Sequence, residues 1–81
     1  MDDKTITFFL NKEQELSTKK IILDVWKALE EKGYNPVNQL AGYILSEDPT
    51  YITAHSGARK SIVKLDRDEL LKTLIRSYVG K

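Results

Sequence analysis

The sequence predicts a small, mostly α-helical protein with four or five short helices and one short N-terminal β-strand. Apolar residues recur at helical spacing in several segments between residues 17 and 79, and capping residues or prolines precede most of these segments. Only residues 5–10 show apolar residues at a spacing of two. The 81 residues are expected to form one domain over residues 1–81, with residues 1–4 as a flexible tail.

The predicted strand is the segment of β-branched and aromatic residues from Thr5 to Leu10, followed by a polar loop at residues 11–15. Ile6, Phe8 and Leu10 would share one face of this strand. A lone strand leaves backbone groups unpaired, so it is expected to pair with the same segment of a second copy across a twofold axis. The alternative is a disordered tail that forms no strand.

The first helix is expected to be capped by Ser17 or Thr18 and to run to Lys32. Gly33 can adopt the left-handed conformation that closes a helix. The residues at helical spacing that should be buried are Ile21, Ile22, Val25, Trp26 and Leu29.

Asn35 and Pro36 supply a capping side chain and a first helical residue for a second helix, over residues 36–46. Asp48 and Pro49 repeat this signal and open a short turn that reaches residue 52. The second helix should point five side chains inward, namely Val37, Leu40, Ala41, Ile44 and Leu45.

Two further helices are predicted towards the C-terminus. Ser56 should cap a helix that carries Ala58 and Ile62. Asp66 and Glu69 form a capping-box pattern at the start of the last helix, which Gly80 ends. The apolar side of the last helix consists of Leu70, Leu71, Leu74, Ile75 and Tyr78.

The composition excludes several classes of protein. There is no cysteine and a single histidine, which argues against disulfides and zinc sites. No apolar run is long enough to insert into a membrane, and the polar N-terminus is unlike a signal peptide. The 13 basic and 12 acidic residues are intermixed, so no basic face indicates nucleic-acid binding.

No arrangement typical of an enzyme is visible. His55 and Ser56 are adjacent, and adjacent loop residues rarely face each other as base and nucleophile. The glycines are isolated, so no phosphate-binding loop is present. The sequence therefore predicts no catalytic residues and no cofactor.

One alternative function stays open, because the turn between the first two predicted helices resembles a helix-turn-helix. Asn38 and Gln39 could contact bases, with Arg59 and Lys60 on the phosphates. No lysine or arginine flanks Asn38 and Gln39, however, and phosphate contacts carry most nucleic-acid affinity.

The segment from Ala28 to Ile52, ALEEKGYNPVNQLAGYILSEDPTYI, resembles the signature of the IreB family, small YrzL-like regulatory phosphoproteins of Gram-positive bacteria. The similarity continues through Ala58, Arg59 and the segment Arg67–Leu70. The signature residues are Gly33, Tyr34, Asn35, Pro36, Asn38, Gln39, Gly42, Asp48 and Pro49.

The resemblance implies a cytoplasmic homodimer that is a substrate of a transmembrane Ser/Thr kinase and its phosphatase. It also implies a link to cell-envelope stress and intrinsic cephalosporin resistance. The family's N-terminal threonine pattern aligns with residues 3–8 and falls on Thr5, with Thr7 as the second candidate. Phosphate at these positions is expected to act as a charge switch that loosens the N-terminal segment.

Overall fold

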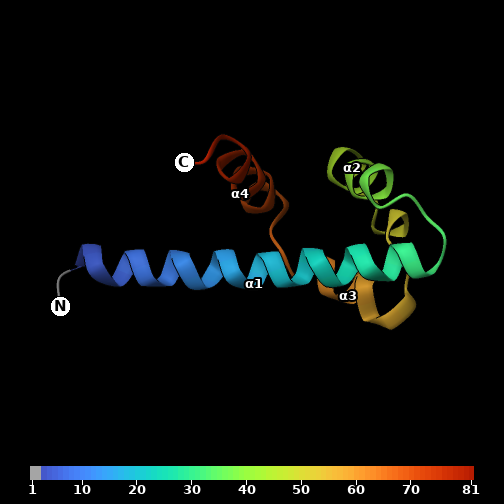
Figure 1. Ribbon diagram of the computed structural model, residues 1–81, viewed down its shortest axis with the longest axis horizontal. Helices are drawn as coiled ribbons and strands as arrows, with labels where there is room; N and C mark the ends of the chain where they lie inside the picture. Colours follow the sequence, from blue (N-terminus) through green and yellow to red (C-terminus); the bar gives the residue numbers. More distant parts are fainter. Residues whose placement is uncertain (1–2) are drawn as a thin grey trace.

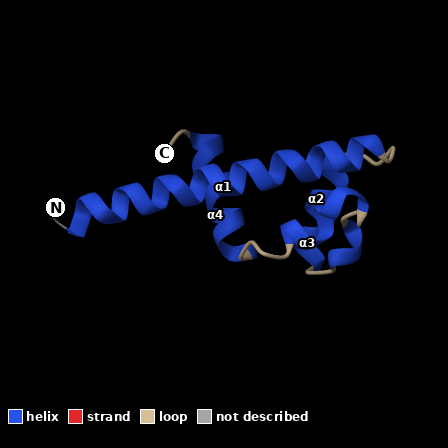
Figure 2. Cartoon of the chain, turned by 90° about the horizontal axis from the view of Figure 1, so that it is seen from below, coloured by secondary structure: helices blue, strands red, loops and turns tan. Residues whose placement is uncertain are grey.

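A single long helix forms the axis of the molecule, and the shorter helices lie along it (Figure 1). The computed structural model describes the backbone of residues 3–81 and the side chains of residue 13 and residues 15–81. Figure 2 shows that the described chain is helical apart from short connections. The elements in order are α1 (Asp3–Glu31), α2 (Pro36–Ser46), the 3₁₀ helices η1 (Pro49–Tyr51) and η2 (His55–Gly57), α3 (Ala58–Ile62) and α4 (Arg67–Val79).

The hydrophobic core lies on the C-terminal half of α1, where α2 and α3 pack (Figure 1). Burial of apolar side chains in this core is the main favourable contribution to folding in a protein of this size. The N-terminal half of α1 projects beyond this body. The buried core residues are Val25, Ala28, Leu29, Tyr43, Ile52, Ala58, Ile62 and Leu70.

The prediction of an N-terminal strand is wrong, because Thr5–Leu10 and the predicted loop at residues 11–15 are both part of α1. Residues 12–16 are Lys, Glu, Gln, Glu and Leu, all good helix formers. Once the packed half of α1 is formed, each added residue extends the helix without a new nucleation cost. The described residues 3–81 contain no strand. Residues 3–81 therefore contain no unpaired strand edge that would require pairing with a second copy.

Two predicted helix starts are wrong. Since α1 begins at Asp3, neither Ser17 nor Thr18 caps a helix, and the predicted tail at residues 1–4 overlaps the first helical turn. Met1 and Asp2 lie outside the described residues. Ser56 does not cap α3, because Gly57 precedes that helix and makes no side-chain cap. Ser56 instead takes a left-handed conformation, with φ of 54°.

The predicted turn between α1 and α2 is confirmed. Gly33 has a φ of 80° and follows the end of α1. The Asn35 side chain accepts a hydrogen bond of 3.1 Å from the Asn38 backbone N–H, and Pro36 is the first residue of α2. Local chemistry thus determines where α1 ends and α2 begins.

Asp66 and Gly80 bound α4 as predicted. Asp66 caps the helix by accepting a hydrogen bond of 3.1 Å from the Asp68 backbone N–H. Gly80, with a φ of 77°, ends it. Within the helix, however, only Leu70 is buried.

Several side chains that were predicted to face inward are exposed. Helical spacing identifies an apolar side, but one small chain does not supply enough neighbours to cover all of it. The affected residues are Trp26, Val37, Ala41, Leu45, Leu71, Leu74, Ile75 and Tyr78.

Candidate functional site

The signature residues of α2 attach this helix to η1. The Gln39 side-chain amide donates a hydrogen bond of 2.9 Å to the backbone carbonyl of Tyr51. The ring of Tyr51 lies directly on Gly42, where a Cβ atom would be 2.4 Å from a ring carbon. A glycine in the middle of a helix is normally unfavourable, and here it allows this close approach.

Asp48 and Pro49 repeat at η1 the arrangement that begins α2. The Asp48 carboxylate accepts hydrogen bonds from the Thr50 backbone N–H at 3.0 Å and from the Thr50 hydroxyl at 2.7 Å. These hydrogen bonds lower the pKa of Asp48 below its usual value, the hydroxyl contributing most. Most of the signature therefore fixes the backbone between α1 and η1, which is a structural role.

Two of the four side chains that were considered for nucleic-acid binding make hydrogen bonds within the protein. Gln39 is bonded to Tyr51, and the Arg59 Nε donates a hydrogen bond of 2.9 Å to the Ile52 carbonyl. Asn38 and Lys60 are exposed, and α2 itself carries no charged residue. Nothing in the described geometry favours binding to a phosphate backbone.

His55 makes its ring contact with α1 and not with Ser56. Its Nε2 lies 2.8 Å from a carboxylate oxygen of Glu31 at the end of α1. This pair closes the loop that carries η2 onto the long helix. Within the described residues, no cluster of His, Asp or Glu side chains is placed to hold a metal ion.

The Glu31 carboxylate is expected to contribute to stability in a pH-dependent way. The hydrogen bond from His55 holds the pKa of Glu31 below its ordinary value of 4.5, with the charges of His55 and Lys27 contributing less. A carboxyl whose pKa is lower in the folded state stabilises above its unfolded pKa, and this contribution is lost as the pH falls through the folded pKa. When unfolding by urea is measured between pH 6 and about pH 3, the free energy of unfolding should fall less with decreasing pH for Glu31→Gln than for the parent. Identical acid profiles for the two proteins would contradict this role, and Glu30→Gln is the matched control.

Arg67 anchors the first turn of α4 to the end of α2. Its Nη1 donates a hydrogen bond of 2.7 Å to the Ile44 carbonyl, and its other terminal nitrogen pairs with the Glu47 carboxylate. Glu47 lies just past α2 in a left-handed conformation, with φ of 64°. Together with buried Leu70, this contact holds α4 by its N-terminal turn.

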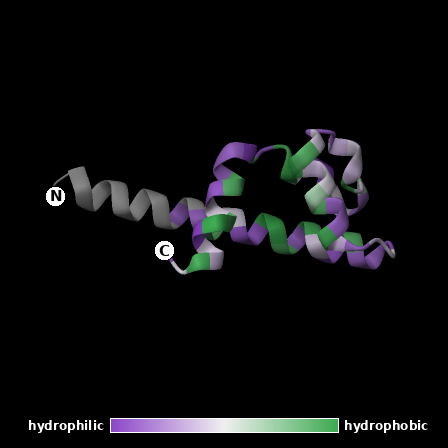
Figure 3. Cartoon of the chain, turned by 90° about the horizontal axis from the view of Figure 1, so that it is seen from above, coloured by the Kyte–Doolittle hydropathy of each residue, from purple (hydrophilic) through white to green (hydrophobic). Residues whose placement is uncertain are grey.

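The remainder of α4 presents an exposed apolar stripe. Leu71, Ile75 and Tyr78 follow one another at helical spacing, and the side chains of Ile75 and Tyr78 are 55% and 92% exposed. Figure 3 shows hydrophobic residues on α4 as well as on the packed half of α1. Surfaces of this kind are candidates for contacts with other molecules.

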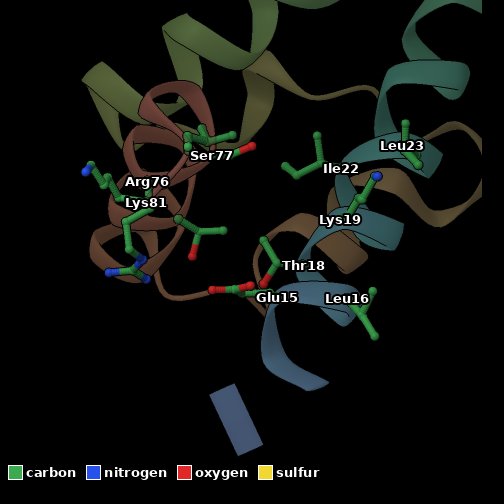
Figure 4. Close-up of a pocket in the computed structure, with 12 residues that line it drawn as sticks. Glu15, Leu16, Thr18, Lys19, Ile22, Leu23, Arg76, Ser77 and Lys81 are labelled. Carbon is green, nitrogen blue, oxygen red and sulfur yellow. The ribbon is translucent and has the colours of Figure 1, made fainter. Parts of the chain in front are cut away.

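A groove of about 430 Å³ lies between α1 and the C-terminal half of α4 (Figure 4). Glu15, Thr18 and Ile22 come from the side of α1 that faces α4. The groove is a concave feature to consider as a binding site, because ligand sites are commonly hollows between helices. Its lining residues are Glu15, Leu16, Thr18, Lys19, Ile22, Leu23, Thr73, Leu74, Arg76, Ser77, Gly80 and Lys81.

The candidate phosphorylation residues Thr5 and Thr7 lie in the first two turns of α1. Their side chains lie outside the described residues, so their assignment stays a prediction. Their backbone position nevertheless differs from the prediction, since it is helical and not extended. The groove could not be predicted from the sequence, because the residues of its two walls are at least 50 positions apart in the chain.

Comparison with models of known protein families gives a match over most of the chain. The family model described as IreB regulatory phosphoprotein matches residues 3–80, nearly the entire chain. Among the helices of the described residues, none combines the length and apolarity that crossing a membrane requires.

Proposed function

Because the chain belongs to the IreB family of regulatory phosphoproteins, we propose that it is a small cytoplasmic regulator controlled by reversible phosphorylation. A transmembrane Ser/Thr kinase adds the phosphate and its phosphatase removes it. The match over residues 3–80 carries this proposal, and the family is not one of enzymes. The proposal includes a role in cell-envelope stress and intrinsic cephalosporin resistance, as the resemblance of the signature implies.

The position of Thr5 and Thr7 in α1 supports a mechanism in which phosphate orders the N-terminal segment and does not loosen it. Phosphorylation adds about −1.5 to −2 charges, and negative charge near a helix N-terminus interacts favourably with the helix dipole. Since α1 begins at Asp3, Thr5 lies in the first turn, where this interaction is strongest, and Thr7 lies at the start of the second turn. Phosphate is therefore proposed to stabilise the first turns of α1 and to present a new negative charge at the tip of the helix.

Incubation with a cognate Ser/Thr kinase and ATP should add phosphate to the peptide that contains Thr5 and Thr7. Both residues belong to the first two turns of α1, and the N-terminal part of this helix extends beyond the packed helices (Figure 1). Mass spectrometry of the N-terminal peptide provides the measurement, and Thr5→Ala and Thr7→Ala identify the acceptor. Phosphate confined to Ser46, Ser56 or Thr73 would contradict this assignment.

We also propose that the protein is a homodimer. Exposed apolar surface supports this proposal, and strand pairing does not. Leu16 and Leu23 of α1 and the stripe Leu71, Ile75 and Tyr78 of α4 are exposed. A small domain without disulfides commonly gains stability by covering such surface in an oligomer.

Light scattering at micromolar concentration should give about twice the mass of one chain. Ile75→Asp should shift this mass towards one chain, because a charge would enter the apolar stripe of α4. Val63→Asp is the control, since Val63 is an exposed apolar residue on another part of the molecule. A single-chain mass for the parent at all concentrations would contradict the homodimer.

A further inference from the structure

Helix α4 is attached to the rest of the protein by its first turn. Leu70 is its only buried residue, at 1% exposure. The other apolar side chains of α4 are 40–92% exposed, and they are Leu71, Leu74, Ile75, Tyr78 and Val79. Because burial of apolar surface is the main source of stability, most of α4 contributes little to holding this helix in place.

Arg67 makes the polar contacts of this attachment. Among the hydrogen bonds and ion pairs of the described side chains, those that join α4 to another element come from Arg67. Its Nη1 donates a hydrogen bond of 2.7 Å to the Ile44 carbonyl, which belongs to the last turn of α2, where carbonyls lack partners within the helix. Its Nη2 pairs with the Glu47 carboxylate. These contacts bring the cationic guanidinium to the negative end of the α2 dipole.

The C-terminal half of α4 is separated from α1 by the groove of about 430 Å³ (Figure 4). On the N-terminal side of α4, Leu65 packs against the core and Arg67 is already the first helical residue. Only Asp66 lies between them, and it is exposed and extended, with φ of −68° and ψ of 121°. A change in the backbone angles of this one residue would therefore move α4 without moving α3.

We propose that α4 is an arm that opens from the body as one unit about Asp66, while α1, α2 and α3 stay packed, and that Arg67 is the latch that keeps it closed. Opening withdraws Leu70 from the core and uncovers Thr18 and Ile22, which lie on the side of α1 that faces α4 (Figure 4). The protein thus has two surfaces, which differ in the apolar area that they expose. Elements with few buried apolar contacts open at a lower free energy than the core of the same protein.

Amide hydrogen exchange of the full chain, followed by NMR under conditions where the rate reports the opening equilibrium, tests this proposal. The amides of residues 71–76, in the middle of α4, should exchange about tenfold or more faster than those of residues 25–29 in the core. Ile52→Val removes one methyl group from a core residue that is 0% exposed. This variant should speed exchange of the core amides about two- to tenfold and leave the α4 amides unchanged, since the core stays packed when α4 opens.

Variants of the latch should act on α4 itself. Arg67→Met should speed exchange of the α4 amides about tenfold, because a charge-assisted hydrogen bond and an ion pair are lost. The core amides should speed up by the same factor, because global unfolding also breaks the latch. Glu47→Gln should have a smaller effect, about two- to fivefold, since its carboxylate is largely exposed. Arg76→Met is the matched control, the same substitution at an exposed position of the same helix.

Two results would overturn the proposal. If Ile52→Val speeds exchange in α4 as much as in the core, α4 opens only when the whole protein unfolds and is not an independent arm. If Arg67→Met speeds exchange in α4 no more than Arg76→Met does, Arg67 is not the latch. Circular dichroism verifies that each variant is folded before exchange is measured.

Discussion

Leu29→Ala is expected to lower the free energy of unfolding by about 2–5 kcal/mol, the largest effect of any single change considered for this chain. Leu29 is 0% exposed and lies on the half of α1 against which α2 and α3 pack. Truncation would remove apolar contacts and leave a cavity in the middle of the core. Because native proteins have a total stability of only about 5–15 kcal/mol, this loss is a large fraction of the whole, and the variant should melt at a clearly lower temperature than the parent.

Urea or thermal unfolding followed by circular dichroism measures this loss. Leu45→Ala is the matched control, because it removes the same atoms from a side chain that is 85% exposed. The control should change the free energy of unfolding by no more than about 0.5 kcal/mol. Similar losses for both variants would show that Leu29 does not occupy the core, or that Leu45 is covered by a partner copy.

Gly33→Val is expected to destabilise the protein by about 1–3 kcal/mol, the cost of holding a non-glycine residue in a sparsely populated backbone region. Gly33 has a φ of 80°, which a β-branched residue strongly disfavours. A Cβ atom at this position would meet nothing within 4 Å, so the cost comes from the backbone conformation and not from a clash.

The series Gly33→Asn, Gly33→Ala and Gly33→Val distinguishes the cost of the backbone conformation from the cost of a steric clash. Asparagine tolerates the left-handed region better than other side chains, so its free-energy cost should be the smallest of the three and that of valine the largest. Thermal melts of the three variants provide the comparison. An order set by side-chain volume, with asparagine more costly than alanine, would contradict the backbone explanation.

The turn from Gly33 to Pro36 and the capped start of η1 could be predicted because each depends on residues adjacent in the chain. Gly33, Asn35 and Asp48 act through their own backbone or through a neighbour two or three residues away. The amino-acid preferences of residues 5–10 alone could not exclude a strand there. The stability of α1 comes from packing that begins near Ile21, which these residues do not reveal. Cooperative extension of that helix overrides the period-two pattern.

The contacts that connect distant elements gave no usable signal in the sequence. His55 pairs with Glu31 across 24 positions, and Arg67 pairs with Glu47 across 20. Gly42 had a signal, because a glycine inside a helix suggests a close approach, but the partner Tyr51 could not be identified without the fold. The groove could not be predicted for the same reason, because its walls come from residues 15–23 and 73–81.

The projecting half of α1 can open locally while the packed half stays folded. Local opening of the first turns of α1 need not disturb the core, whose α1 residues lie between Ile21 and Leu29. Amide hydrogens should therefore exchange fastest near Asp3 and progressively more slowly towards Leu29, where exchange requires global unfolding. Because the two ends of one helix open with different free energies, residues at the tip can be altered or modified with little effect on the stability of the whole domain.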